Sequence, residues 1–471
     1  MREAPEKSGE GGDILRALEF LEERNPGPHA LELAFYRRKA CDWRGLEQVD
    51  ARALTAIRGG VGDNKPLSSL LLKCGADDHL ACAKRFTLNR SGKISALPPG
   101  TRKEGNRLRV AYLSGEYCDH PVARLVVGLF ESHDRDAFEI SGYSCGKTDG
   151  GRLRRRIEQA CDHFYDISAL SDQEGAEKIA NDGADILVDL SGYTRNGRWG
   201  LCARRPAPIQ VSYLGFPGTM GAGFMDYIIA DSYLLPLDQQ KFYTEKIVHL
   251  PECYLAGDSQ RATVRLSRAE LGLPRDALLL AAFNNSQKIT PDLFSVWMRI
   301  LRARSEAILW ILAETSEIED RLRNEAHARG IGPDRLIFAR MAPFEGYMAR
   351  LAAADLFLDC HPFNAGSTAN DALWAGLPIL TMSGRTYVSR MTGAQLSSLG
   401  LSELIVSSPE EYERLALELT RERLSAFRSI LVEKRKSAAL FDSRRQAEGL
   451  ESLYRNMWEN RRIRPGSLSR H

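Results

Sequence analysis

The sequence predicts an α/β protein with two doubly wound, Rossmann-like domains that face a cleft, preceded by a short α-helical region. The chain of 471 residues is too long for one ordinary core. Hydrophobic residues make up 43% of it, which is enough for a normal globular interior. From Arg107 onward, short apolar runs alternate with helical patterns, and the second half of the chain repeats this alternation.

Before Arg107 the chain is expected to be helical. Residues 1–12 are polar, charged and rich in glycine, so we expect them to be disordered. Residues 13–106 are predicted to form a helical region and a linker. Apolar residues share one face of the first helix, namely Ile14, Leu15, Leu18 and Leu21. The NPGP segment at residues 25–28 ends this helix, and a second one is expected from His29 to Cys41.

Residues 107–255 are predicted to form the first Rossmann-like domain, a parallel sheet with helices between most of its strands. The expected strands are Leu108–Leu113, Phe138–Ser144, Ala184–Leu190, Ile209–Gly215 and Tyr227–Asp231. We expect Val248–Tyr254 and the polar residues 258–268 to link this sheet to the next.

Residues 256–440 are predicted to form the second domain, which repeats the plan of the first. Its expected strands are Ala277–Phe283, Ala307–Leu312, Arg335–Ala339, Asp355–Cys360 and Leu377–Met382. Residues 441–471 are expected to hold a last long helix, Arg444–Asn460, and a tail. Ligands of open α/β sheets bind at the carboxyl ends of the strands, so we expect the site there.

The composition disfavours several classes of protein. A net charge of +2 gives no argument for nucleic acid binding. No apolar run approaches the ~18 residues of a membrane span, and the N-terminus lacks the apolar segment of a signal peptide. The nine cysteines include no CxxC motif and no cluster with histidine at zinc spacing. We therefore expect no metal site and a reducing, cytoplasmic setting.

The strongest functional signal is a pair of segments in the second half. Lys288 closes the FNNSQK segment after the predicted strand Ala277–Phe283, and Gly366–Asp371 opens a helical pattern with small and hydroxyl residues. An ammonium group and a helix N-terminus that face one crevice can hold a diphosphate. This pairing predicts an enzyme that uses a nucleotide sugar.

The individual residues of these segments suit such a ligand. Asn285 can bond a base or a ribose, Ser367 and Thr368 can bond phosphate, and Asp371 can hold a ribose hydroxyl. Lys288 can neutralise the charge on a leaving diphosphate. The plainer alternative is a solvated lysine and an ordinary helix cap, and only the pairing of the two segments favours function.

Two loops of the first domain are weaker candidates. His120 ends the loop Ser114–Pro121 after the first strand, where it can bond a phosphate or an acceptor hydroxyl. The alternative is a histidine that caps the following helix. Leu214, Gly215 and Pro217 lie in the segment LGFPG, whose backbone can approach a ligand closely. A plain tight turn is the alternative for this loop.

Other chemistries lack their motifs. The sequence has no GxGxxG after a strand, no Walker A motif and no GxSxG elbow. No DxD pair follows a strand, which disfavours a metal-dependent sugar transferase. We therefore expect no cofactor, with Lys288 and a helix N-terminus in the place of a metal.

A resemblance rests on an ordered series of segments: RLRVAYLSGEYCDHP, DILVDLSGYTRNGR, RPAPIQVSYLGFPGTMGAGFMDYIIAD, FNNSQKITPDLFSVWMRIL and LFLDCHPFNAGSTANDALWAGLPILTMSG. Over Arg107–Trp458 this series resembles the catalytic region of the O-GlcNAc transferase / SPINDLY family. The N-terminal helices are similar to the end of the tetratricopeptide array that precedes that region, most of which this chain lacks.

The resemblance implies a GT-B fold and an inverting, metal-independent glycosyltransferase. Such an enzyme moves a sugar, most often N-acetylglucosamine from UDP, to Ser or Thr of a protein or peptide acceptor. By resemblance, His120 is the cleft histidine and Lys288 the lysine that holds the phosphates. The resemblance also implies that Ser367 and Thr368, beside Gly366, bond the diphosphate and that Asp371 bonds the ribose. It implies that the segment with Met341 and Ala342 contacts the uracil, with Arg350 nearby. The loop with Leu214, Gly215 and Pro217 is implied to lie beside the sugar.

The chain departs from the animal pattern around the expected base. Asn285 stands for a glutamine, Phe344 and Tyr347 for a lysine and a histidine, and Gly366 for a histidine. Tyr347 can still stack on a base. A glucosyl- or fucosyltransferase with an asparagine or small-molecule acceptor therefore stays open, as does an inactive protein-binding scaffold. The proton acceptor is also open between His120 and a phosphate oxygen of the donor.

Overall fold

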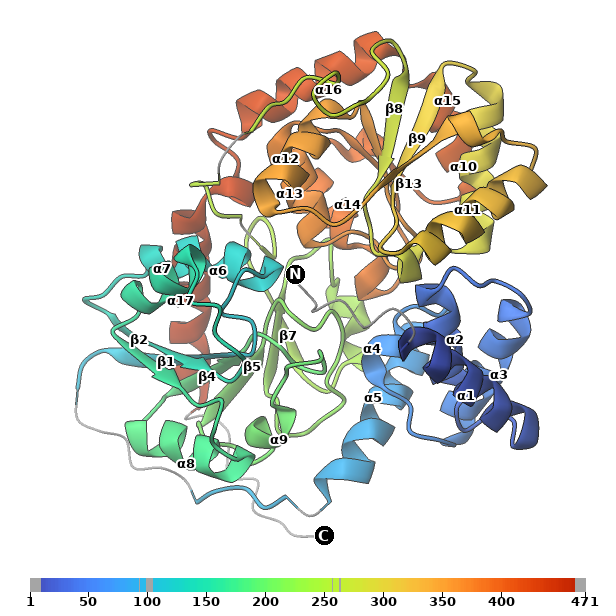
Figure 1. The fold of residues 1–471 in the computed structure, drawn as a ribbon. Coiled ribbons are helices and arrows are strands. Elements are labelled where there is room, and N and C mark those ends of the chain that lie inside the picture. The colour runs from blue at the N-terminus through green and yellow to red at the C-terminus, as the bar shows by residue number, and fades with distance from the viewer. Residues whose placement is uncertain (1–9, 93, 99–104, 256, 262–263, 462–471) are drawn as a thin grey trace. The chain divides into compact units, whose positions relative to one another are not determined.

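The computed structural model describes residues 10–92, 94–98, 105–255, 257–261 and 264–461. The chain divides into two compact units. The first unit contains Ala83–Ser259 and the chain from Asp442 onward, and the second contains the N-terminal helices up to Cys82 and Gln260–Phe441. Each unit is built on one sheet whose strands are all parallel (Figure 1).

The first sheet has seven strands in the order β3-β2-β1-β4-β5-β6-β7. Its strands are β1 Leu108–Ser114, β2 Phe138–Ser144, β3 His163–Asp166, β4 Ile186–Asp189, β5 Ile209–Ser212, β6 Tyr227–Ala230 and β7 Lys246–His249. The central strand β4 is buried along its whole length, as is typical of parallel sheets that are covered on both faces.

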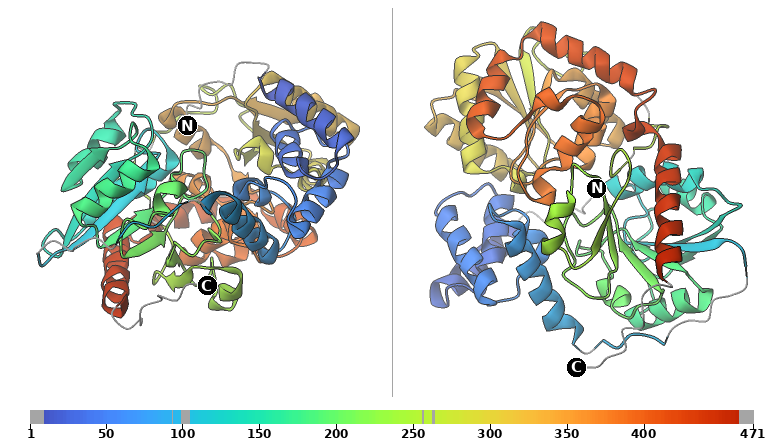
Figure 2. Two further views of the ribbon diagram at one scale, coloured as in Figure 1. Left: turned by 90° about the horizontal axis from the view of Figure 1, so that it is seen from below. Right: turned by 180° about the vertical axis from the view of Figure 1, so that it is seen from behind.

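Helices cover both faces of this sheet. Its helices are α5 Ala76–Ser91, which crosses the boundary between the units, α6 Pro121–Ser132, α7 Arg152–Gln159, α8 Asp172–Asp182, α9 Trp199–Cys202, the 3-10 turn η1 Leu237–Phe242 and α17 Ser443–Asn460. α6 packs against both α7 and α17. Figure 1 shows α6 and α7 on one side of the sheet and α8 and α9 on the other, and Figure 2 shows α17 lying along the strands.

Buried polar contacts fix α17 on the first sheet. The Tyr112 hydroxyl lies 3.0 Å from the Tyr454 hydroxyl and 2.9 Å from Nε2 of His133. Nδ1 of His133 lies 2.9 Å from Oε1 of Glu451, another α17 residue. Because buried polar groups are costly unless they are paired, these contacts set the register of the C-terminal helix on β1 and α6.

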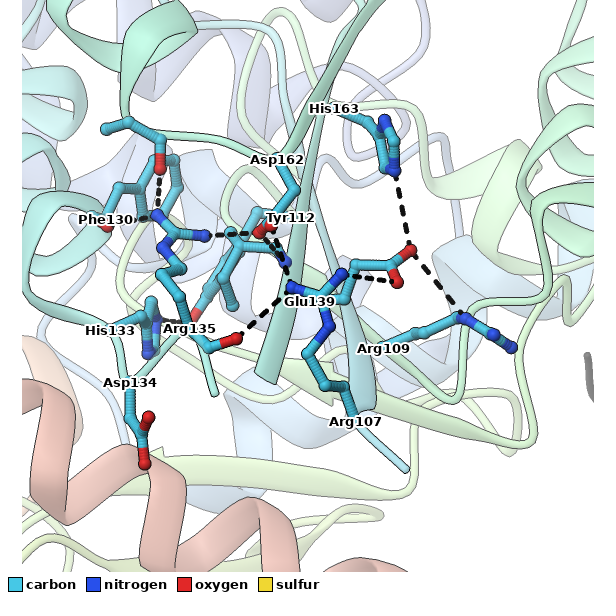
Figure 3. A network of polar contacts seen from close by, with 12 residues as sticks. Arg107, Arg109, Tyr112, Phe130, His133, Asp134, Arg135, Glu139, Asp162 and His163 are labelled. Atoms are coloured by element: carbon cyan, nitrogen blue, oxygen red, sulfur yellow. Dashed lines mark hydrogen bonds and ion pairs between the residues drawn. The ribbon is translucent and has the colours of Figure 1, made fainter. Parts of the chain in front are cut away.

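An ion-pair network ties the amino ends of β1, β2 and β3 together (Figure 3). Arg107 donates to Asp162 at 2.9 Å and to Glu139 at 3.2 Å, and Arg135 donates to Asp162 at 2.7 Å. Asp162 also accepts the backbone N–H of Ile140 at 2.9 Å. The network lies where the strands begin, at the opposite end from the edge where such sheets bind ligands.

The second sheet has six strands in the order β10-β9-β8-β11-β12-β13. They are β8 Leu278–Ala282, β9 Ala307–Leu312, β10 Leu336–Ala339, β11 Leu356–Leu358, β12 Ile379–Met382 and β13 Ile405–Val406. Its helices are α10 Pro291–Ala303, α11 Ser316–Ala328, α12 Phe344–Ala353, α13 Ser367–Ala375, α14 Met391–Ser398, α15 Pro409–Glu418 and α16 Arg421–Lys434. Short 3-10 turns are η2 Ser286–Lys288, η3 Pro333–Arg335, η4 Tyr387–Ser389, η5 Ser402–Leu404 and η6 Ala439–Phe441.

The N-terminal helices belong to the second unit. They are α1 Glu10–Arg24, α2 Ala30–Lys39, α3 Leu46–Gly59 and α4 Pro66–Ser69. α2 packs against α1 and α3, and it also contacts η2 beyond β8. Among the described helices, none is both long and apolar enough to cross a bilayer.

The prediction of two doubly wound parallel sheets is confirmed, with every predicted strand present. Two details were wrong. Val248–Tyr254 was expected to be a linker, but Val248 and His249 end strand β7, which pairs with β6. α1 begins at Glu10, so residues 10–12 are helical, while residues 1–9 lie outside the described residues. The predicted domain boundaries themselves stay predictions.

The short strands β3 and β13 were not predicted. β3 is an edge strand with the sequence HFYD, whose residues are all half-buried or exposed, and β13 has only two residues. Neither carries the apolar run that marks a buried strand.

In each sheet an aspartate precedes one central strand and accepts a backbone N–H of the neighbouring strand. Asp185 precedes β4 and accepts the backbone N–H of Arg109 in β1 at 3.0 Å. Asp355 precedes β11 and accepts the N–H of Leu279 in β8 at 2.8 Å. A second aspartate follows four residues later in each sheet, Asp189 and Asp359, at the carboxyl ends where loops leave the sheet.

Candidate active site

Lys288 lies on the 3-10 turn that follows β8. The residue as a whole is half-buried. Its ammonium donates to the carbonyl oxygen of Asn364 at 2.9 Å and lies 4.0 Å from the centre of the Phe363 ring. Burial lowers the pKa of Lys288 to about 8, and the neighbouring Asp359 and Cys360 oppose this shift. The amine therefore carries its charge at neutral pH but holds its proton more weakly than an exposed lysine.

The loop that receives Lys288 is organised by the buried carboxylate of Asp359. Oδ1 accepts the backbone N–H groups of Cys360 and Ala365, both at 2.8 Å, and the Asn284 amide at 3.1 Å. Oδ2 accepts the Thr381 hydroxyl at 2.7 Å. A fully buried carboxylate with this many donors holds the loop from β11 to α13 in one conformation.

The N-terminus of α13 directly follows this loop. Gly366 is the N-cap residue and offers no side chain to cap the helix. Gly366, Ser367 and Thr368 are half-buried, so the first turn is partly accessible. The first N–H groups of a helix have no acceptor within the helix, and the helix dipole adds partial positive charge there. Lys288 donates to the carbonyl of Asn364, two residues before Gly366. The loop that leads into α13 is therefore also the loop that binds the ammonium.

Asp371 lies in α13 and is bonded to an arginine that the sequence did not single out. Nη1 of Arg261 donates to Oδ1 of Asp371 at 2.7 Å, and both side chains are buried. The Arg261 guanidinium also lies 4.9 Å from the centre of the Trp374 ring. A ribose hydroxyl on Asp371 would therefore share the carboxylate with Arg261.

The residues expected around the base lie after β10 and on α12, which packs against α13. Met341 is 54% exposed, and Ala342 and Tyr347 are half-buried. The Tyr347 ring lies 6.2 Å from the ring of Phe344, and Arg350 donates to the backbone carbonyl of Arg340. Asn285, which precedes the turn of Lys288, is exposed.

In the first unit, His120 is the N-cap of α6. Its Nδ1 accepts the backbone N–H of Val122 at 3.2 Å, and its Nε2 lies 3.6 Å from Oε2 of Glu116. Burial lowers the pKa of His120 to about 3, so the ring is neutral at pH 7. Since Nδ1 accepts, the proton of the neutral ring is on Nε2, so the side of the ring near Glu116 is a hydrogen-bond donor.

Glu116 is a second group in this loop that the sequence did not single out. Its carboxylate accepts the Asn196 amide at 3.0 Å, and burial raises its pKa. The only sequence signal was its position four residues before His120 in the loop after β1.

The loop after β5 has a constrained backbone. Leu214 has a left-handed φ of 75°, which is uncommon for a residue other than glycine. A Cβ at Gly215 would lie 1.9 Å from the Leu190 carbonyl oxygen, so only glycine fits. Pro217 is buried, and the buried Glu245 accepts the Thr219 hydroxyl at 2.6 Å just beyond it. Strained loops of this kind gather at functional sites.

Comparison with known proteins identifies the family. The model of glycosyl transferase family 41 matches residues 66–267 and 259–450. The chain belongs to this family. It is 36% identical over 388 residues to SEC of Arabidopsis thaliana, a probable UDP-N-acetylglucosamine–peptide N-acetylglucosaminyltransferase. The aligned residues cover 80% of this chain and 40% of that protein.

Two further comparisons agree with this result. A probable SPINDLY transferase of Eustoma exaltatum is 29% identical, with 84% of this chain and 44% of the relative covered. The structure of an O-GlcNAc transferase mutant from Thermobaculum terrenum superimposes with a TM-score of 0.81 at 27% identity, covering 96% of this chain and 88% of that one. The chain thus has the two Rossmann-like domains of the GT-B fold, and it spans about two fifths of the length of these curated relatives.

The predicted site residues fall into two groups. One group is in the second unit, on the turn η2 after β8, at the end of the loop after β11 and on α13: Lys288, Gly366, Ser367, Thr368 and Asp371. His120 and the loop of Leu214, Gly215 and Pro217 lie after β1 and β5 of the first unit. Within the described residues, no three histidine, cysteine, aspartate or glutamate side chains gather in the manner of a metal site. The functional roles of these residues stay predictions.

Replacement of Asp359 by asparagine is expected to loosen the loop before α13. The amide keeps the shape but places a donor against groups that already donate, which costs about 1–3 kcal/mol of unfolding free energy. We expect the dissociation constant for UDP to rise about tenfold, measured by calorimetry, a factor worth about 1.4 kcal/mol.

The matched control is Asp189→Asn at the same place in the other sheet, where Oδ1 accepts the N–H groups of Ser191 and Gly192. It should lower stability by a similar amount and leave UDP affinity unchanged. Equal UDP affinity in the Asp359 variant and the wild type would contradict the assigned role of this carboxylate.

Proposed function

We propose that the chain is a glycosyltransferase that moves a sugar from a nucleoside diphosphate to a protein, most simply N-acetylglucosamine from UDP to Ser or Thr. Membership of family 41 and the names of the relatives support the reaction class and the protein acceptor. The observation that carries the proposal is the bond from Lys288 to the Asn364 carbonyl, which places an ammonium group beside the N-terminus of α13.

Lys288 and α13 suit the leaving group of this reaction. When the acceptor oxygen attacks the anomeric carbon, the bond from that carbon to the diphosphate breaks and its electrons move to the phosphate oxygens. Negative charge grows at the diphosphate, and preorganised positive groups lower the barrier most where charge develops. In this proposal the ammonium and the N–H groups of the first turn of α13 take the part of a divalent cation, and the attack inverts the anomeric centre.

The proton of the acceptor hydroxyl needs a base, and we assign that part to a phosphate oxygen of the donor. Nδ1 of His120 already accepts the N–H of Val122, so Nε2 carries the proton of the neutral ring. His120 then donates a hydrogen bond to the donor phosphate or to the acceptor, which orients the reacting groups. The roles of Leu214, Gly215 and Pro217 at the sugar rest on the family resemblance and the constrained backbone of their loop.

The change Lys288→Ala is expected to lower turnover by about 10²–10³, the range found when one preorganised electrostatic group is removed. Release of UDP and the mass of an acceptor peptide measure the effect. Lys436→Ala, an exposed lysine of the same unit, is the control and should retain full turnover. Near-normal turnover of the Lys288 variant, with its fold intact by circular dichroism, would remove the ammonium from the mechanism.

The donor can be identified with a thermal-shift panel of UDP, GDP and their sugars. A ligand that binds only the folded protein at 100 times its dissociation constant adds about 2.7 kcal/mol of stability. We expect UDP and UDP-N-acetylglucosamine to give the largest shifts. A larger shift with GDP would point to a different base beside Phe344 and Tyr347, and no shift with any nucleotide would favour a scaffold.

The pH profile of kcat/KM should fall above pH about 8, because Lys288 has a pKa of about 8 and loses its charge there. The expected slope is a loss of about tenfold per pH unit, since one proton is lost. Lys288→Arg should abolish this alkaline fall, even at reduced activity, because a guanidinium stays charged. An unchanged alkaline limb in the arginine variant would assign the titration to another group.

A further inference from the structure

The turn that carries Lys288 has a second neighbour, the carboxyl end of α2. The Ser286 hydroxyl donates to the Lys39 carbonyl oxygen at 2.8 Å, across 247 residues of sequence. The Cys41 thiol lies 4.0 Å from the Ser286 carbonyl oxygen. Ser286 and Cys41 are both buried, so these contacts are shielded from water.

The end of α2 is built to need such partners. The last carbonyl groups of a helix have no N–H partner within the helix and must find one elsewhere. α2 ends at Lys39, and Cys41 turns the chain away with a left-handed φ of 50°. Ser286 satisfies the Lys39 carbonyl, and Arg321 of α11 donates to the Ala40 carbonyl at 2.7 Å. The sheet domain therefore supplies the cap of this helix.

Ser286 is also held from the side of the sheet. Its backbone N–H donates to Oε1 of Glu314, which follows β9, at 3.0 Å. Its carbonyl oxygen accepts the N–H of Ile289, which closes the turn around Lys288. With its N–H, hydroxyl and carbonyl all engaged, Ser286 passes any displacement of α2 directly to the turn that aims the ammonium.

We propose that α2 positions Lys288 through Ser286, so that the N-terminal helices influence the affinity of the enzyme for the donor diphosphate. Ser286 acts as a positioning residue, because it is buried, begins the turn of Lys288 and uses its hydroxyl to bond α2. A partner that binds the N-terminal helices and shifts α2 would then change donor affinity. This inference rests on the proposed function, since it assumes that Lys288 binds a nucleoside diphosphate.

A double-mutant cycle on UDP affinity tests the proposal. Ser286→Ala removes the hydroxyl that bonds α2, and we expect the dissociation constant for UDP to rise five- to twentyfold by calorimetry. If Ser286 acts through Lys288, the same change in a Lys288→Ala background should raise the constant by less than twofold. Such non-additive effects of the two substitutions on UDP affinity would show that Ser286 and Lys288 are energetically coupled.

Ser132→Ala is the matched control, since the Ser132 hydroxyl donates to the Gly128 carbonyl at 2.7 Å in the other unit. It should leave UDP affinity unchanged. Arg321→Met, which removes the other cap of α2, should weaken UDP binding as Ser286→Ala does.

The outcomes separate the two proposals. Unchanged UDP affinity in Ser286→Ala, or an equal loss with and without Lys288, would overturn the link from α2 while leaving the proposed function intact. Unchanged UDP affinity in Lys288→Ala alone would overturn the proposed role of the lysine itself.

Discussion

The loop that receives Lys288 depends on one buried carboxylate at the end of a central strand. Asp359 gathers two backbone N–H groups, an amide and a hydroxyl, and so fixes the loop between β11 and α13. That loop presents the Asn364 carbonyl to Lys288 and ends at Gly366, the N-cap of α13. Without the carboxylate, the ammonium and the helix N-terminus would have no common frame. The first sheet uses Asp189 in the same manner.

The position of Lys288 costs its ammonium group part of its hydration. Lys288 gives up part of its water to lie against Phe363 and Asn364, and burial lowers its pKa. The loss makes the ammonium a stronger partner for a diphosphate, because an ion that is poorly solvated gains more from an anion in a medium of low dielectric. In the proposed function, an anionic ligand would therefore add favourable charge interactions that the Asn364 carbonyl and the Phe363 ring alone do not supply.

The N-terminal helices are part of this frame. α2 ends on the turn of Lys288, and its last carbonyls are capped by Ser286 and Arg321. The helices lie in the same compact unit as the second sheet. The curated relatives are about twice as long as this chain, and the described N-terminal helices contribute to the compact unit that contains Lys288.

The sequence by itself determined the two parallel sheets, because short continuous apolar runs such as LLLAA and ILV mark strands buried on both faces. It also determined the chemistry of the candidates Lys288 and Ser367, since a lysine and a helix start after buried strands suit an anion. The spacing of the paired aspartates around β4 and β11 was readable in the sequence, but what they bond was not.

Only the tertiary structure decided which distant groups meet. The short edge strand β3 has no apolar signature. The end of β7 was predicted to be a linker, because its pairing with β6 cannot be read from its own residues. The partnerships of Arg261 with Asp371 and of Ser286 with Lys39 join residues more than a hundred positions apart. The tautomer of His120 follows from the N–H of Val122. Periodicity records whether a residue is buried, whereas its partner is set by the packing of the whole unit.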